Sequence, residues 1–316
     1  MRAIAPVELA IRGVNRARRA AYRRGWLGGR RLSRPVISIG NRSVGGSGKT
    51  PATIAFARAL LARGLRPAIL TRGYGRFSDE QAIRVDTPDP VRFGDEPVVM
   101  AISLPGVPII VGSDRYRSGS DFLRSGECDL FLLDDGFQHL QLERDVDVVI
   151  EGGGSAWLRE GESALADADV VLHRGGGKTD DERHFAAALS PLGWRAVDAV
   201  LPPQAMNGES VLAIAGLAEP RQFFRMVRET GADVRGEIDF GDHHRYVPRD
   251  LEAIEGERVR AGASRVVTTL KDAVKTRPLG GEYLVLDVEM RFESEERLIA
   301  KIISLAHQNF RDAGGL

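Results

Sequence analysis

The stretch that decides the fold is Ser43-Val44-Gly45-Gly46-Ser47-Gly48-Lys49-Thr50. An apolar run at 35–40 precedes it and predicts a buried strand, and the residues from about 50 to 63 predict a helix. Phosphate binding needs backbone N–H groups turned toward one point, a lysine that reaches the terminal phosphates and a hydroxyl for Mg²⁺. Ser43 replaces the glycine of the strict pattern, but the three glycines still free the backbone. We predict a phosphate-binding loop, and a flexible loop before a helix is the alternative.

Further strands and helices alternate along the first half of the chain. Apolar runs predict strands at 66–71, 107–112, 129–134, 145–150 and 168–172, and helices are expected near 97–103 and 114–125. A second unit of the same kind follows, with strands at 211–215, 234–239, 265–269 and 283–287 and helices at 220–230, 249–261 and 294–308. Such alternation favours an α/β fold: a mostly parallel sheet with helices on both faces, and a second, smaller α/β domain.

Three regions are expected along the chain. Residues 1–30 predict a basic amphipathic helix, 31–200 a P-loop domain, and 201–316 the smaller C-terminal α/β domain. We place the boundary near 180–205, where prolines interrupt the pattern.

Composition excludes several classes of protein. The chain has 316 residues, 43% of them hydrophobic and 28% charged, which is typical of a globular protein. Its only cysteine, Cys128, rules out an intrachain disulfide and fits a reducing cytoplasm. No apolar run is long enough to span a membrane, so any membrane contact is expected to be peripheral. Residues 1–31 are strongly basic, with nine arginines against one acid, Glu8.

An acidic pair ends the strand at 129–134. Asp134 and Asp135 are expected at the sheet edge where α/β proteins bind ligands. A carboxylate in this position commonly holds the Mg²⁺ of a nucleotide. An acidic turn after a strand is the alternative, and the neighbouring phosphate loop favours the metal.

Two other strings leave their roles open. In Gly94-Asp95-Glu96-Pro97, Asp95 is either a helix N-cap or a base for a hydroxyl acceptor, and the sequence alone favours the cap. Asp242-His243-His244 could contribute to a zinc site, but adjacent histidines point in different directions and no third ligand is evident. Surface histidines are the alternative, and the pattern leaves that choice undecided.

Taken together, these strings resemble the tetraacyldisaccharide 4′-kinase family, the lipid A 4′-kinases of Gram-negative bacteria. The resemblance runs in order from about residue 35 to 275. It is carried by Gly40-Asn41 with Ser43 to Pro51, Thr71 to Gly75, Gly94 to Pro97, Gly112 to Arg115, Asp134-Asp135-Gly136-Phe137-Gln138-His139, Ala215-Gly216 with Pro220 and Phe223-Phe224, Phe240 with Asp242 to Tyr246, and Lys271-Asp272-Ala273-Val274-Lys275.

The resemblance implies transfer of the ATP γ-phosphate to the 4′-hydroxyl of an acylated glucosamine disaccharide 1-phosphate, with ATP and Mg²⁺ as cofactors. Residues 43–50 would bind ATP, with Lys49 on the phosphates. Asp95 becomes the expected base, assisted by His243 or His244, which reverses the preference for an N-cap. Metal-binding positions are Thr50, Glu96, Asp134 and Asp135. Substrate-binding positions are Tyr74, Arg115, His139, Arg159 and Glu160.

Location and partners follow from the same resemblance. The N-terminal helix matches a membrane-contacting segment, so we expect a peripheral protein at the cytoplasmic face of the inner membrane, bound to its anionic surface. We expect a monomer with no nucleic-acid partner. The sequence departs from the family before Leu158-Arg159-Glu160, where Gly152 to Trp157 replace an expected proline-rich loop.

Two other functions are possible for such a chain. A membrane-associated partitioning ATPase also has a Gly-Gly-x-Gly-Lys-Thr loop, but it carries a lysine before the two glycines, where Val44 stands here. A kinase of a soluble metabolite would use the N-terminal helix only for packing, and the arginine-rich face of that helix argues weakly against it.

Overall fold

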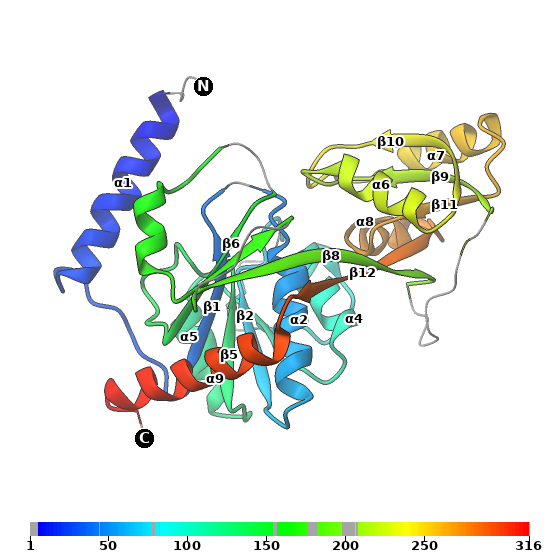
Figure 1. Cartoon of the computed structure of the whole chain (residues 1–316). Helices are drawn as coiled ribbons and strands as arrows, with labels where there is room; N and C mark the ends of the chain where they lie inside the picture. The colour runs from blue at the N-terminus through cyan, green and yellow to red at the C-terminus, as the bar shows by residue number, and fades with distance from the viewer. Residues whose placement is uncertain are drawn as a thin grey trace.

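The computed structural model describes residues 6–43, 45–77, 80–81, 83–153, 157–175, 182–197, 206 and 208–315. The strands within these ranges are β1 (Val36–Asn41), β2 (Pro67–Thr71), β3 (Ile83–Arg84), β4 (Ile109–Val111), β5 (Leu130–Asp134), β6 (Val146–Glu151), β7 (Val170–Arg174), β8 (His184–Arg195), β9 (Ser210–Ala215), β10 (Asp233–Asp239), β11 (Arg265–Thr268) and β12 (Leu284–Phe292). They form one sheet in the order β10-β9-β11-β12-β8-β7-β6-β1-β5-β2-β4-β3 (Figure 1).

The helices of the described ranges cover this sheet. They are α1 (Pro6–Arg23), α2 (Lys49–Leu61), α3 (Pro90–Phe93), α4 (Asp95–Ser103), α5 (Arg115–Leu123), α6 (Pro220–Glu229), α7 (Pro248–Arg260), α8 (Leu270–Thr276) and α9 (Glu295–Asp312), with 3₁₀ turns η1 (Glu162–Asp167) and η2 (Arg277–Leu279). Parallel pairs join β1 to β5 and β6, β2 to β4 and β5, and β9 to β10 and β11. The predicted α/β fold with a mostly parallel sheet is therefore confirmed.

The two halves of the sheet are joined by an antiparallel pair, β8 and β12. Both strands are long and cross between the halves in Figure 1. The sequence missed β8, because Pro191 and Gly193 interrupt it at the point where the register with Asp287 and Val288 shifts. A bulge tolerates such residues inside a strand, so their presence did not mean that the strand was absent.

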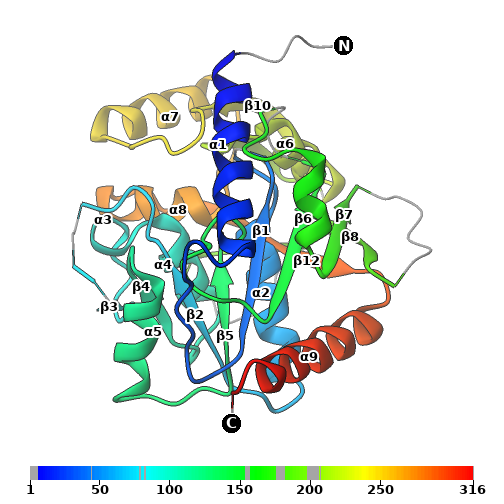
Figure 2. The same cartoon turned by 90° about the vertical axis from the view of Figure 1, so that its left-hand side faces the viewer.

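The final helix packs on the first half of the chain. α9 contacts α2, β1 and β6, and Figure 2 shows it beneath this part of the sheet. Its Leu298, Ile299 and Ile302 are buried. The strand before it, β12, is joined to α2 by stacking of Phe292 on Phe56, with ring centroids 4.7 Å apart. The division at residue 200 stays a prediction, since the chain returns to the first half after it.

Truncation of Ile302 tests this packing. Ile302→Ala is expected to lower the free energy of unfolding by about 2–5 kcal/mol, because the side chain is almost fully buried under the sheet. The measurement is urea denaturation of the ligand-free protein. Ser304→Ala on the exposed side of α9 is the control and should change stability by less than about 0.5 kcal/mol. A loss below about 1 kcal/mol for Ile302→Ala would contradict the packing.

Candidate active site

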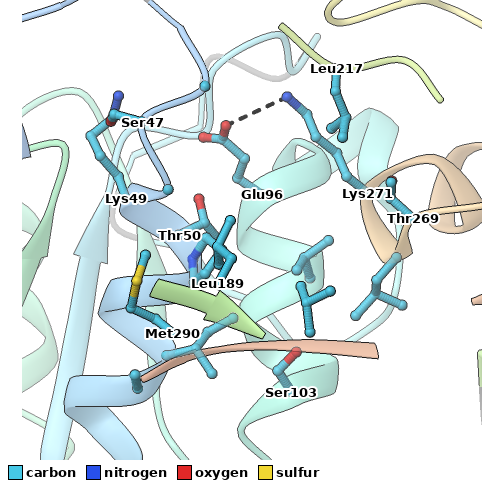
Figure 3. Close-up of a pocket in the computed structure, with 18 of the residues that line it drawn as sticks. Ser47, Lys49, Thr50, Glu96, Ser103, Leu189, Leu217, Thr269, Lys271 and Met290 are labelled. Carbon is cyan, nitrogen blue, oxygen red and sulfur yellow. Dashed lines mark ion pairs between the residues drawn. The ribbon is translucent and has the colours of Figure 1, made fainter. Parts of the chain in front are cut away.

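A cavity of about 760 Å³ opens where the carboxyl ends of the parallel strands meet the C-terminal half. Ligands of open α/β sheets bind at this edge. The cavity is lined by the loop after β1, by the acidic ends of α4 and β5, and by the turns of the second half around residues 217–219, 242–243 and 269–271. Figure 3 shows Lys49 and Thr50 on one side of it and Leu217, Thr269 and Lys271 on the other.

The loop after β1 has the backbone of a phosphate cradle. Gly48 is the N-cap of α2 and has φ 85°, a left-handed conformation that glycine adopts without strain. The loop is held from below by Asn41, whose Nδ2 donates to Ser43 Oγ at 2.9 Å and to Ser47 Oγ at 2.7 Å. Lys49 Nζ donates to Asn41 Oδ1 at 3.3 Å. Of the predicted ATP-binding residues 43–50, Val44 lies outside the described residues, and the others form the loop before α2 and the first residues of that helix.

Three carboxylates face this loop. Asp134 is buried and accepts from Thr53 Oγ1 and Thr71 Oγ1, both at 3.1 Å. Burial, with repulsion from Glu96 and Asp135, raises the pKa of Asp134 to about 7. Burial likewise raises the pKa of Glu96.

Asp135 differs from its two neighbours. Burial alone would raise the pKa of its carboxyl, but Lys49 and Arg159 more than offset this and lower it. Lys49 Nζ lies 3.6 Å from Asp135 Oδ1, and Arg159 Nη1 lies 3.5 Å from Oδ2. Its φ of 50° is unusual for a residue other than glycine.

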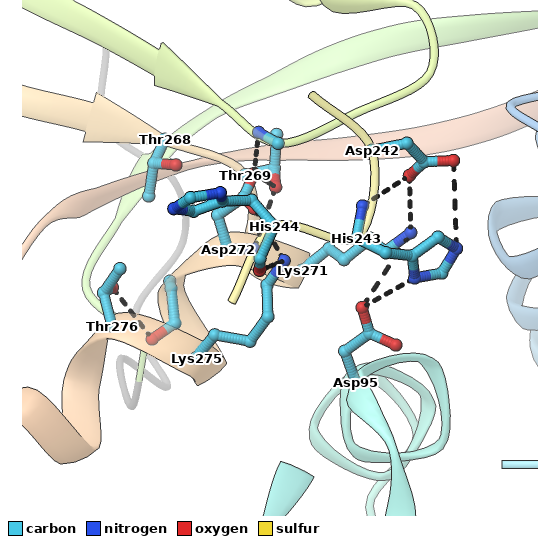
Figure 4. A network of polar contacts seen from close by, with 12 residues as sticks. Asp95, Asp242, His243, His244, Thr268, Thr269, Lys271, Asp272, Lys275 and Thr276 are labelled. Atoms are coloured by element: carbon cyan, nitrogen blue, oxygen red, sulfur yellow. Dashed lines mark hydrogen bonds and ion pairs between the residues drawn. The ribbon is translucent and has the colours of Figure 1, made fainter. Parts of the chain in front are cut away.

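Asp95 and His243 meet across the cleft (Figure 4). Asp95 is the first residue of α4 and is 8% exposed, and its Oδ2 lies 3.6 Å from His243 Nδ1. Burial raises the pKa of this carboxyl, but the contact with His243 and the charges of Lys271 and Lys275 outweigh it and lower the pKa. The cap of α4 is Gly94, so the N-cap suggested by the sequence is wrong.

The two adjacent histidines have different surroundings. His243 lines the cavity, has φ 56° and lies against Tyr74, with ring centroids 5.0 Å apart. His244 points away, and its Nε2 lies 3.0 Å from Asp250 Oδ2. Its ring packs between Phe240 and Tyr246. Of the two histidines, His243 lines the cavity and His244 does not.

Lys271 brings a positive charge from the second half. Its Nζ lies 3.2 Å from Asp242 Oδ1, 3.7 Å from Glu96 Oε1 and 3.9 Å from Asp95 Oδ2. Burial alone would lower the pKa of Lys271, but the three carboxylates together outweigh burial, so the net shift of the pKa is upward. The ammonium therefore stays charged in the cleft.

A model of the tetraacyldisaccharide-1-P 4′-kinase family matches residues 1–307. This chain belongs to that family. Since the family is one of kinases, a partitioning ATPase is no longer supported.

Proteins named tetraacyldisaccharide 4′-kinase are similar over most of their length. That of Geobacter sulfurreducens is 38% identical over 305 residues, covering 86% of this chain and 84% of that protein. That of Chromobacterium violaceum is 37% identical over 290 residues, covering 86% and 83%. The crystal structure of LpxK from Aquifex aeolicus in complex with ATP superposes with a TM-score of 0.77 at 28% identity, covering 95% of this chain and 97% of that one.

The predicted substrate positions of the family fall in two groups. Tyr74 and Arg159 line the cavity, and Tyr74 is 61% exposed at its rim. Arg115, which is buried, and His139, which is half-buried, do not line it. Burial, together with Arg72, lowers the pKa of Arg115 to about 10, and burial with Arg115, Arg144 and Arg18 lowers the pKa of His139 to about 3. His139 is therefore neutral, and its role in binding stays a prediction.

Glu160 is connected to the N-terminal helix. Arg19 donates to both of its carboxylate oxygens at 2.8 Å, and both side chains are almost fully buried. The Arg19 guanidinium also stacks over the Phe137 ring at 4.2 Å. Gln138 Nε2 donates to the same carboxylate at 3.0 Å. The loop with Arg159 and Glu160 is thus held in place by α1.

Sequence reasoning missed four polar residues of the site. Gln138 and Asn41 stand inside strings that carried the family resemblance, and Lys271 opens another, but none had a role assigned. Arg174 follows a predicted strand, where arginines can hold phosphate. Its Nη1 donates to Gly46 O at 2.7 Å and its Nη2 bonds to Glu219 of the second half. The position of Arg174 at a strand end was the available signal.

Asp134→Asn tests the electrostatics of the ligand-free site. Because the pKa of Asp134 is raised in the folded protein, the folded state holds the proton more tightly than the unfolded state. The resulting contribution to the free energy of unfolding is fully present below the unfolded pKa of about 4 and is lost as the pH rises through about 7. The variant removes that loss, so at pH 8 it should unfold with a free energy on the order of 1–3 kcal/mol above wild type. The gain should shrink as the pH falls and should disappear below about pH 4.

Denaturant titrations at several pH values provide the measurement. Asp312→Asn, an exposed acid at the end of α9, is the control and should leave the pH dependence unchanged. A variant that is less stable than wild type at pH 8 would show that the Asp134 carboxylate is not under electrostatic stress.

Proposed function

We propose that this chain transfers the γ-phosphate of ATP to the 4′-hydroxyl of tetraacyldisaccharide 1-phosphate in lipid A biosynthesis, with Asp95 as the base. Family membership supports the reaction. The single observation that carries the residue assignment is the contact of Asp95 with His243, which lines the phosphate-loop cavity. A base must be ionised and within reach of the attacking oxygen, and the lowered pKa of Asp95 meets the first condition.

The proposed reaction is a single in-line displacement. The acceptor oxygen forms a bond to the γ-phosphorus, the bond to the β–γ bridging oxygen breaks with its electrons leaving on ADP, and the hydroxyl proton passes to Asp95 Oδ2. Loop amides and Lys49 stabilise the charge on the transferred group. His243 Nδ1 orients Oδ2, and Asp242 Oδ2, 3.8 Å from His243 Nε2, orients the ring in turn. We assign the assisting role to His243 and not to His244.

The residues present fit a Mg²⁺ ion shared with ATP. Asp135 Oδ1 is buried without a hydrogen-bond partner, and Glu96 stands close enough to Asp134 to help raise the pKa of that carboxyl. In the described part of the chain no three acidic, histidine or cysteine side chains form a ready metal cluster. Mg²⁺ commonly takes one or two carboxylates and completes its shell with phosphate and water. Thr50, Glu96, Asp134 and Asp135 would hold it, and it would neutralise phosphate charge.

Helix α1 is the proposed membrane contact. Its docked face is polar: Glu8 accepts from Leu158 N–H at 3.2 Å, Asn15 donates to Arg159 O at 2.9 Å, and Arg19 binds Glu160. Its apolar side chains are exposed instead, with Val7 at 59% and Val14 at 66%.

Exposed apolar residues among arginines are typical of helices that lie in a membrane interface. In the ranges that the structure covers, no helix is both long and apolar enough to span a bilayer. The anionic inner face of the membrane, where the lipid substrate would be presented, is therefore the proposed partner of α1.

Asp95→Asn tests the chemistry. With γ-labelled ATP, Mg²⁺ and detergent-dispersed tetraacyldisaccharide 1-phosphate, wild type should label the lipid, and Lys49→Ala should not. Asp95→Asn should lower kcat about 10²–10⁴-fold, because a base typically contributes that factor. Asp86→Asn, an exposed neighbouring acid, is the control. Absence of label with wild type would overturn the function, and near-normal turnover of Asp95→Asn would overturn the base.

Vesicle flotation tests the membrane contact. The double variant Val7→Asp/Val14→Asp should bind vesicles containing anionic lipid at least about tenfold more weakly than wild type, since it places charge in the apolar face. The control Leu61→Asp/Val259→Asp adds the same charges at exposed apolar positions on α2 and α7. Equal binding by the two double variants would contradict the proposal. Activity on dispersed substrate in detergent should be retained by both.

A further inference from the structure

Lys271 is a charged group of the cleft to which the reaction as described gives no role. It is the second residue of α8, after the cap Thr269, and its side chain is 16% exposed. Figure 4 shows it reaching out of the second half toward Asp242 and Asp95, and Figure 3 shows it facing Glu96. These three carboxylates come from two separate parts of the chain, and the ammonium is the point at which they converge.

The three contacts locate the ammonium between the phosphate loop and the base. Asp95 is the residue proposed to receive the acceptor proton, and Glu96 follows it on α4. Asp242 lies on the other side, where its Oδ2 is 3.9 Å from the position that a Cβ on Gly45 would occupy. A group near all three is close to the region in which the γ-phosphate and the attacking oxygen must meet.

The helix that carries Lys271 is fixed, but the side chain is long. α8 packs on α4 through a shared apolar cluster that includes Val98, Leu270 and Val274. The backbone at 271 is therefore held in place, while a lysine stem has four rotatable bonds. An ammonium that neutralises carboxylates without ligand can turn toward phosphate oxygens a few ångströms away, because both are anionic oxygen partners.

We propose that Lys271 is a second phosphate-contacting cation of the phosphoryl-transfer centre, which meets the γ-phosphate from the side opposite Lys49. This proposal rests on the proposed function. No bond forms or breaks at Lys271: the ammonium keeps its three protons and stabilises the negative charge on the transferred group. The second half of the chain would thus supply a charge that the phosphate loop alone lacks.

The alternative is that Lys271 only ties α8 to α4. If Lys271 only held α8 against α4, its loss would weaken the binding of ATP and of ADP to the same extent. If it contacts the γ-phosphate, its loss weakens the binding of ATP and leaves that of ADP unchanged. The decisive quantity is therefore the ratio of the two affinities, which does not depend on lipid phosphorylation. It can be read even if the lipid substrate is misassigned.

The experiment compares wild type, Lys271→Met and Lys271→Arg, with Lys301→Met as the control. Lys301 lies on α9 and does not line the cavity. Titration calorimetry with Mg²⁺ gives Kd for ATP and for ADP, and γ-labelled ATP with the lipid gives kcat. Lys271→Met should weaken ATP at least about tenfold, leave ADP within about twofold, and lower kcat about 10²–10³-fold. Lys271→Arg keeps the positive charge, and its kcat should be at least about tenfold higher than that of Lys271→Met.

Three results would overturn the proposal. The first is an equal loss of affinity for ATP and for ADP in Lys271→Met, and the second is an unchanged kcat in that variant. The third is a Lys271→Arg variant that does not exceed Lys271→Met in either the ratio of ATP to ADP affinity or kcat. If wild type labels no lipid but Lys271→Met still weakens ATP alone, the proposed acceptor fails and the phosphate contact stands. Thermal unfolding of each variant verifies that it is folded before the titrations.

Discussion

The repulsion among carboxylates buried at one edge of the sheet is the constraint on which the site depends. Asp95, Glu96, Asp134 and Asp135 lie close together at the ends of β5 and α4, and burying like charges is unfavourable unless cations or protons compensate. Two of these groups respond with raised pKa values, and the other two are held ionised by nearby cations. Such a site is poised to accept positive charge and to receive a proton.

The fold delivers the compensating cations from separate segments. Lys49 comes from the start of α2, Arg159 from a loop held by α1, and Lys271 from α8 in the second half. The β8–β12 pair joins the halves into one sheet, and Arg174 links the phosphate loop to Glu219 across the same cleft. Because no single segment supplies the full set of charges, the relative position of the halves sets the chemistry of the site.

The N-terminal helix has two chemically different faces, one docked and polar and the other exposed with apolar side chains. The polar face binds the loop at 158–160, and a buried Arg19–Glu160 pair fixes the connection. Removal of one partner of such a pair leaves an uncompensated buried charge, so the two segments are strongly linked. In the proposed account the same helix touches the membrane, which would bring the lipid substrate to the loop that carries Arg159.

Sequence alone predicted the parts of the fold whose signals are local. The phosphate loop, the strand ending in Asp134 and Asp135, and most helices depend on short patterns of apolar residues and glycines. β8 could not be predicted in this way, since it contains Pro191 and Gly193 and is defined by its pairing with β12. The N-cap reading of Asp95 was wrong because Gly94 takes that position.

Adjacent residues posed the same difficulty in the site. His243 and His244 are indistinguishable in sequence, and only the turn with φ 56° at His243 and the pocket of Phe240 and Tyr246 around His244 separate them. Lys271 stood in a string that carried the family resemblance, yet its reach across to α4 is a tertiary contact between residues far apart in sequence. No local pattern encodes such a contact.

In the proposed reaction, phosphate passes directly from ATP to the lipid without a phosphorylated enzyme. The stereochemistry at phosphorus tests this direct transfer. With ATP made chiral at the γ-position by sulfur and oxygen isotopes, one in-line displacement inverts the configuration in the lipid product. Inversion is the predicted result. Retention would mean two displacements through a phosphorylated side chain, such as His243 or Asp95, and would contradict the account.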